Sequence, residues 1–190
     1  MNSSPATNGP TGPHGAIKSS PVHDFRERLA WSEEAGDEPF WDRIYRKAFP
    51  NLVNHMQTSG DTVSQRMGID RLIMLANGHT LRIDEKKREQ DWPDILLEYL
   101  SNDQTNAPGW MNKDLAIDYL AYAFMPSQRV YLFPWPLLRR AWLEFGDQWI
   151  EQYETKIARN SGYNTHSVAI PTNVLTQTVQ RAMIIELQPA

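Results

Sequence analysis

The dipeptide Asn77-Gly78 is the feature that most constrains the fold, because it stands between two short apolar runs. Residues 69–75 and 80–87 have the length and the residue types of β-strands. Asn-Gly between two such runs is a strong hairpin signal, since both residues accept the positive φ angles that tight turns require. We therefore expect an antiparallel hairpin over residues 69–87.

Charged residues lie at the open end of this hairpin. Asp70 begins the first strand, and the run Asp84-Glu85-Lys86-Lys87 ends the second. Carboxylate oxygens are suitable ligands for Mg²⁺ or Mn²⁺, which can activate a water molecule and offset charge on a phosphate. A nearby ammonium group can orient the nucleophile or stabilise the transition state. The pattern indicates hydrolysis of a phosphodiester bond.

The register of the hairpin decides which of these residues share a site, because the side chains of a strand alternate between its two faces. A two-residue turn at Asn77-Gly78 places Asp70 opposite Glu85, with Lys87 on the same face. In this register, Glu85 and Lys87 complete the site.

A three-residue loop over residues 76–78, with Gly78 in the left-handed conformation, gives the other register. It places Asp70 opposite Asp84, with Lys86 on the same face. The opposite face then collects the apolar residues Ile69, Ile73, Leu75, Leu81 and Ile83, with Arg71 as the one exception. We favour this register because it gathers an apolar face, and the two-residue turn remains the alternative.

Hydrophobic periodicity predicts further helices and strands along the chain. The helices lie near residues 23–30, 40–52, 136–150 and 171–183, and the strands lie at residues 95–100, 115–124, 129–133 and 167–170. We expect Pro50 to break or kink the second of these helices. This order fits an α/β protein with a mixed central β-sheet that helices cover on both faces. The chain lacks both regular strand-helix alternation and a Gly-rich phosphate loop, which disfavours nucleotide hydrolysis.

Composition limits the chemistry and the partners of the protein. The net charge of −4 and the pI near 5.7 disfavour indiscriminate binding to nucleic acid, which depends on Lys and Arg. The chain has no cysteine, so any metal ion must be held by oxygen or imidazole ligands. His55 and His166 are too isolated in the sequence to indicate a metal site.

The length of 190 residues suits one domain, which we place at residues 23–190. Residues 1–22 are rich in Pro, Gly, Ser, Asn and Thr, and we expect them to form a disordered tail. The chain has no apolar run of the length that a membrane span needs and no apolar stretch typical of a secretory signal. We therefore expect a cytoplasmic protein without a membrane partner.

The charged hairpin resembles the active-site hairpin of the PD-(D/E)XK nuclease superfamily. Members of that superfamily have an Asp at the start of one strand and, on the next strand, an apolar residue followed by Asp or Glu, any residue and Lys. Asp70 and the run Ile83-Asp84-Glu85-Lys86 match this pattern. The resemblance implies the restriction-endonuclease-like fold, with an αβββαβ core and, in this chain, an inserted hairpin.

The resemblance also implies roles for the matching residues. Asp70 and Asp84 would bind Mg²⁺ or Mn²⁺, Glu85 would supply its backbone carbonyl to the metal, and Lys86 would position the attacking water. The implied activity is that of a metal-dependent endo- or exonuclease, acting on DNA before RNA. Ile69 stands where many members carry proline, which is a common variation.

Some alternatives stay open at this stage. A further acid from the first core helix could be Glu34, Glu38 or Asp42, and Glu98 is either a third acid of the site or a charge at the sheet edge. A non-catalytic nucleic-acid-binding or assembly protein that retains the fold is the alternative function, and the acidic net charge favours it. A second copy of the chain, as in a homodimer, or another protein is a further candidate partner.

Overall fold

The structure is a computed structural model that describes residues 38–58, 62–180 and 183–187. Contacts divide the chain into two compact units, Met1–Glu38 and Pro39–Ala190. Apart from Glu38, the elements described below belong to the second unit. The expected tail over residues 1–22 and the expected helix near residues 23–30 lie outside the described residues.

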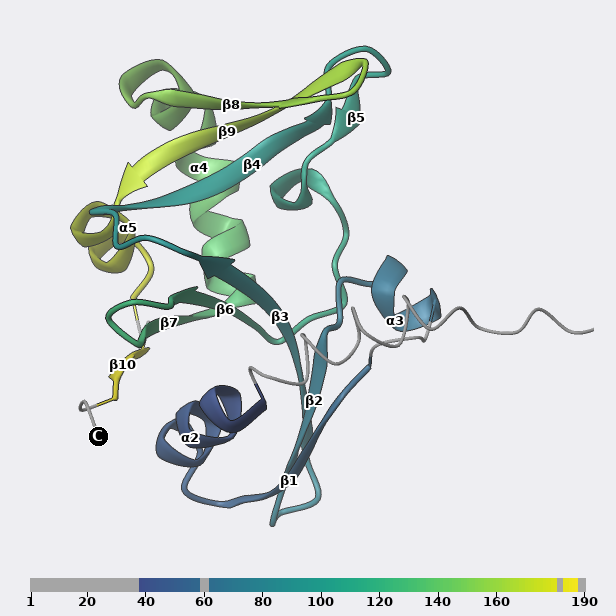
Figure 1. Cartoon of the computed structure of the whole chain (residues 1–190), viewed down its shortest axis with the longest axis vertical. Helices are drawn as coiled ribbons and strands as arrows, with labels where there is room; N and C mark the ends of the chain where they lie inside the picture. Colours follow the sequence, from purple (N-terminus) through teal and green to yellow (C-terminus); the bar gives the residue numbers. More distant parts are fainter. Residues whose placement is uncertain (1–37, 59–61, 181–182, 188–190) are drawn as a thin grey trace, which may run out of the picture. The chain divides into compact units, whose positions relative to one another are not determined.

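Helices and strands alternate irregularly along the second unit (Figure 1). The helices are α2 (Glu38–Ala48), α3 (Thr62–Arg66), the 3-10 helix η2 (Trp110–Asn112), α4 (Trp135–Gln152) and α5 (Thr172–Thr178). The strands are β1 (Leu52–Gln57), β2 (Arg71–Leu75), β3 (Thr80–Arg88), β4 (Asp94–Asn102), β5 (Ala107–Pro108), β6 (Tyr119–Phe124), β7 (Arg129–Pro134), β8 (Thr155–Asn160), β9 (Tyr163–Pro171) and β10 (Met183–Glu186). Within the described part of the chain, no helix combines the length and the apolar character needed to cross a membrane.

The strands form two sheets. One sheet has the order β1-β2-β3-β6-β7-β10, and the other has the order β5-β4-β9-β8. β3 and β6 pair in parallel, whereas the other strand pairs of both sheets are antiparallel. Figure 1 shows the chain passing from β3 into β4, which lies in the sheet at the top of the view. The expected α/β class with a mixed sheet is confirmed.

Both faces of the central strands of the six-stranded sheet are buried. Successive side chains of these strands point alternately into two apolar clusters, one on each face. On one face, Trp41 and Tyr45 of α2 belong to the same buried cluster as Ala121 and Ala123 of β6, whose small side chains leave room for the rings. On the other face, the cluster joins β6 and β7 to α4, α5 and the second sheet. Its members include Leu120, Tyr122, Phe124, Tyr131, Phe133, Leu138, Trp142, Leu175, Ile95, Leu97, Val168 and Ile170. Helices therefore cover both faces, as expected.

The break expected at Pro50 is confirmed, and the helix expected over residues 40–52 ends before that proline. It stops at Ala48, because proline at position 50 disfavours the helical conformation of the residue before it. Leu52 instead begins β1, an edge strand that pairs with β2. The apolar spacing that placed Leu52 on the helix is also compatible with the first residue of a strand, so periodicity alone did not separate the two.

The C-terminal region also differs from the prediction. The helix expected over residues 171–183 ends at Thr178, and Met183 begins β10, which pairs with β7. Thr176 and Thr178 bond to backbone carbonyls within α5, a pattern by which threonine competes with helical backbone bonding. β8 was not predicted, because its sequence is mostly polar and all but its first residue are exposed.

Two glycines with positive φ shape the hairpin and the segment before it. Gly78, with φ +82°, closes the hairpin loop, and an added Cβ there would meet no atom within 4 Å. Gly68, with φ +73°, lies two residues before Asp70, and an added Cβ there would come within 2.9 Å of the Leu115 side chain. Ile69 precedes β2 and is buried in the same cluster as α4, whereas Ile73 is buried in the cluster that contains α2, contrary to the expected shared face.

We expect Gly78→Ala to cost about 1 kcal/mol of unfolding free energy, because alanine is strained at positive φ. Gly68→Ala should cost roughly 1 kcal/mol more, since the added methyl group also crowds Leu115. Urea denaturation of both variants measures the difference. Combining Gly68→Ala with Leu115→Ala should remove the extra cost relative to Leu115→Ala alone, and equal costs for the two glycine variants would contradict this account.

Candidate active site

The end of the β2–β3 ladder brings Asp70, the residue before β2, beside Asp84. The ladder runs from Arg71 opposite Ile83 to Met74 opposite Thr80, and Asp70 lies just beyond it, with its side chain hydrogen-bonded to that of Asp84. The Leu75 amide donates to the His79 carbonyl at 2.9 Å, which closes a three-residue loop over residues 76–78. The favoured register is confirmed, and the two-residue turn, which pairs Asp70 with Glu85, is wrong.

Three hydrogen bonds fix Asp70 at the start of β2. Its amide donates to the Ile83 carbonyl at 2.8 Å, and its carbonyl accepts from the Thr58 amide at 2.9 Å. Its Oδ2 atom accepts from the backbone amide of Glu85, also at 2.8 Å. Both the backbone and the carboxylate of Asp70 are therefore held against the open end of the hairpin.

Asp84 is a buried acid with a perturbed pKa. Its residue is 2% exposed, and burial raises the pKa of its carboxyl to about 7. Lys86 opposes this shift, and a hydrogen bond between the Asp84 and Asp70 side chains adds to it. Asp84 therefore keeps its proton up to near-neutral pH in the absence of a cation, because burial disfavours its charged form and the neighbouring Asp70 adds to that effect.

Lys86 completes the group on this face of β3. Its ammonium nitrogen donates to Oδ1 of Asp84. The Lys86 side chain is 34% exposed, whereas that of Asp84 is 3% exposed. The ammonium group thus connects the buried carboxyl to solvent, from which water and a substrate arrive.

Glu85 points to the opposite face of β3, toward α2. Its carboxylate accepts hydrogen bonds from Arg71 at 2.6 Å and from Tyr45 at 2.7 Å. Burial raises the pKa of Glu85, and the bonds from Arg71 and Tyr45 oppose that rise. The carboxylate is therefore engaged away from Asp70 and Asp84, and only the backbone of Glu85 reaches their side of the strand.

The other acids considered from the sequence have different positions. Asp42 of α2 bonds to Arg46 and His55, and Glu98 lies in the second sheet, where β4 pairs it with Ser167 of β9. Glu38 is the first residue of α2, and Glu34 lies outside the described residues. Over residues 38–58, 62–180 and 183–187, no three or more Asp, Glu, His or Cys side chains are arranged to hold a metal ion.

A pair of carboxylates is nevertheless a suitable donor set for Mg²⁺ or Mn²⁺. Mg²⁺ is commonly bound by one or two carboxylates, with water and phosphate oxygens completing its coordination. Asp70 and Asp84 provide such a pair at one point of the sheet, in a setting where a cation would offset their mutual repulsion. These two residues therefore fit a divalent cation.

Two arginines that sequence reasoning missed lie on the same face of β3 and flank the acid–lysine pair. Arg82 makes a two-bond contact with Asp118, at 3.0 and 3.1 Å. Arg88 contacts Asp94 at 3.4 Å. Both occupy even-numbered positions of β3, so the alternation that groups Asp84 with Lys86 could have identified them.

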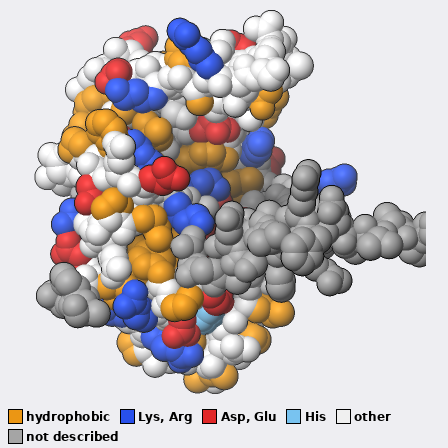
Figure 2. All heavy atoms as spheres, viewed as in Figure 1, with side chains coloured by type: hydrophobic (Ala, Val, Ile, Leu, Met, Phe, Trp, Pro, Cys, Tyr) orange, Lys and Arg blue, Asp and Glu red, His pale blue; other side chains and the backbone are white. Residues whose placement is uncertain are grey.

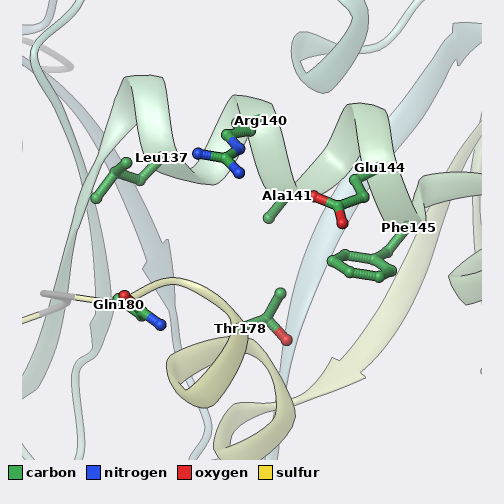
Figure 3. Close-up of a pocket in the computed structure, with 7 residues that line it drawn as sticks. All are labelled: Leu137, Arg140, Ala141, Glu144, Phe145, Thr178 and Gln180. Atoms are coloured by element: carbon green, nitrogen blue, oxygen red, sulfur yellow. The ribbon is translucent and has the colours of Figure 1, made fainter.

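A separate hollow of about 420 Å³ lies between α4 and α5 (Figure 3). The polar groups of the hollow come from Arg140 and Glu144 of α4, from Thr178 at the end of α5 and from Gln180. Among its lining residues Glu144 is the single carboxylate, and none belongs to the β2–β3 hairpin. This hollow offers no donor set comparable to that of Asp70 and Asp84.

Comparisons with protein-family models, with curated proteins and with solved structures found no match to this chain. The chemistry of the site therefore has to be argued from its own residues.

The raised pKa of Asp84 predicts how stability depends on pH. Between about pH 4 and pH 7 the folded protein binds a proton at Asp84 that the unfolded chain has lost, so the contribution of Asp84 to stability falls as pH rises through this window. With EDTA present, Asp84→Asn should therefore raise the unfolding free energy at pH 8 by on the order of 2 kcal/mol and change it little at pH 4.

Asp118→Asn is a matched control of opposite sign. Burial raises the pKa of Asp118, but its hydrogen bonds with Arg82 lower the pKa by more, so the net shift is downward. This acid stabilises the fold above the unfolded pKa, so its removal should destabilise the protein at pH 8. Urea titrations at both pH values measure the unfolding free energy of both variants. An effect of Asp84→Asn that does not depend on pH would contradict the claim that buried Asp84 is protonated up to near-neutral pH.

Proposed function

We propose that this protein is a metal-dependent nuclease of the PD-(D/E)XK superfamily, with a restriction-endonuclease-like fold. It hydrolyses phosphodiester bonds, and DNA is the substrate we expect first, with RNA second. One observation carries the proposal. Asp70 and Asp84 share a hydrogen bond at one point of the β2–β3 hairpin, with Lys86 on the same face and paired to Asp84.

The first part of the element order supports the proposed fold. The proposal assigns α2, β1, β2 and β3 to the first part of the αβββαβ core. The strand parallel to β3 is β6. The connection between β3 and β6 carries β4, β5 and η2 where that core has a helix, which is the main departure from the pattern.

Each residue of the site has a separate role in the proposed hydrolysis. Asp70 and Asp84 would hold the metal ion with their carboxylates, and Glu85 would contribute its backbone carbonyl. Bound there, Mg²⁺ or Mn²⁺ would activate a water and offset charge on the phosphate. Lys86 orients the attacking water and stabilises negative charge that develops on the phosphate. A proton and a cation would compete for the Asp84 carboxylate, so metal affinity should fall as the pH falls below about 7.

The charge distribution limits how strongly the protein can bind nucleic acid. Acidic and basic side chains are interspersed over the face seen in Figure 2. Together with the net charge of −4, this mixture opposes strong non-specific binding to a polyanion. The same acidic balance supports the alternative function, a non-catalytic nucleic-acid-binding or assembly protein that retains the fold.

We expect Lys86→Ala to lower the rate of Mg²⁺-dependent or Mn²⁺-dependent cleavage by on the order of 10² to 10³, because it removes the group that positions water and stabilises charge. Lys87→Ala is the matched control, since Lys87 lies on the other face of β3, and its effect should be small. A mixed panel of DNA and RNA substrates measures both variants. Both should keep the circular dichroism and melting temperature of the unmutated protein.

If Lys87→Ala is the inactive variant, the assignment of the active lysine is wrong. If the unmutated protein cleaves no substrate with either cation, alone or with its natural partners, the nuclease proposal fails and the alternative binding function replaces it.

We also expect Asp70→Asn to weaken Mn²⁺ binding at least tenfold, because Asp70 supplies one of the two carboxylates of the donor set. Isothermal titration calorimetry at pH 8 measures the affinity. Asp118→Asn, which removes a carboxylate held by Arg82, should leave that affinity unchanged. Equal affinities for Asp70→Asn and the unmutated protein would exclude Asp70 from the metal site.

A further inference from the structure

A second polar cluster lies on the α2 face of the hairpin, behind the carboxylate pair. Arg71 Nε donates to Oε1 of Glu85 at 2.6 Å, and the Tyr45 hydroxyl donates to the same oxygen at 2.7 Å. Arg71 is fully buried, and the Glu85 side chain is 9% exposed. Burial raises the pKa of Tyr45 well above its usual value, and the neighbouring Glu85 carboxylate adds to the shift, so the phenol remains a donor.

The cluster continues to the surface of α2. Arg71 Nη1 lies 2.9 Å from His55 Nδ1, and His55 Nε2 lies 2.9 Å from Oδ1 of Asp42. Because arginine only donates, His55 Nδ1 accepts, and the imidazole proton resides on Nε2, which donates to Asp42. The Asp42 side chain is 37% exposed. One hydrogen-bonded chain thus runs from the surface of α2 through β1 and β2 to Glu85 on β3.

This cluster is joined directly to the proposed metal site. Arg71 and Glu85 follow Asp70 and Asp84 in sequence, so each member of the buried ion pair is the chain neighbour of one carboxylate. The amide of Glu85 also donates to Oδ2 of Asp70 at 2.8 Å. Arg71 and Tyr45 therefore fix the side chain of Glu85, and the backbone amide of Glu85 holds the carboxylate of Asp70.

The stability of the fold does not explain why the cluster is ionic. A buried ion pair has a large desolvation cost, and a well-packed apolar pair of similar volume is often as stable or more stable. Position explains it better. Asp70 and Asp84 lie where the β2–β3 ladder ends, and on the opposite face Arg71 of β2 bonds to Glu85 of β3 and so ties the two strands together at the same point.

We propose that Arg71, Tyr45 and Glu85 are positioning residues for the carboxylate pair, which hold the Glu85 amide on Asp70 and keep both acids at metal-binding separation. This inference rests on the proposed metal-dependent activity. The three side chains touch neither the metal ion nor the substrate. They act through the backbone of β2 and β3, as outer residues of metal sites act through the ligands that they orient.

The double variant Arg71→Met/Glu85→Met separates positioning from stability. It removes both charges and leaves side chains of similar length, so we expect it to fold with a melting temperature close to that of the unmutated protein. Its Mn²⁺ affinity and its kcat should each fall about 10- to 100-fold, with little change in KM for nucleic acid. The matched control is Arg129→Met/Glu186→Met, a cross-strand ion pair of β7 and β10 in the same sheet, which should change neither quantity.

Tyr45→Phe tests the same inference without altering a charge. It removes one hydrogen bond to Glu85, and we expect the Mn²⁺ affinity to fall several-fold while the melting temperature changes little. If the double variant does not fold, Tyr45→Phe decides the question. An unchanged Mn²⁺ affinity in Tyr45→Phe then overturns the inference.

The measurements on the unmutated protein distinguish the two proposals. If it binds Mn²⁺ and cleaves nucleic acid, and a folded double variant does so equally well, the positioning role is wrong and the nuclease function stands. If the unmutated protein neither binds Mn²⁺ nor cleaves, the proposed function fails, and the positioning role fails with it.

Discussion

The pairing of β2 with β3 determines which side chains can act together, because a shift of one residue moves every side chain of a strand to the other face. The three-residue loop closed at Leu75 and His79, with Gly78 at positive φ, fixes this register. One face of the hairpin then presents Asp70, Asp84 and Lys86. The opposite face receives Arg71 and Glu85, so the chemistry of both faces depends on the same pairing.

Burial of both faces explains why each charged group of the hairpin has a specific partner. An unpaired charge in an apolar interior costs far more than an exposed one. The Asp84 carboxyl is paired with the Lys86 ammonium group and hydrogen-bonded to the Asp70 side chain. The Glu85 carboxylate is paired with Arg71 and with the hydroxyl of Tyr45. The candidate site and its supporting cluster therefore lie on opposite faces of the same two strands.

The parts of the structure that sequence predicted are those governed by local chemistry. Asn77-Gly78 and strand alternation were sufficient to place Asp84 with Lys86. Arg71 was treated as an exception on an apolar face, because nothing in one sequence shows that α2 brings Tyr45 against it. His55 was set aside as isolated, yet the pairing of β1 with β2 places it beside Arg71. Such long-range pairings carry no local signal, which is also why β10, the partner of β7, was missed.

The position of a bound Mn²⁺ ion tests the central claim most directly. Anomalous diffraction from crystals grown with MnCl₂ at pH 8 locates the ion without reference to activity. The account predicts one Mn²⁺ peak with carboxylate oxygens of both Asp70 and Asp84 at on the order of 2 Å. A Mn²⁺ peak held by other residues, with Asp70 and Asp84 unliganded, would contradict it.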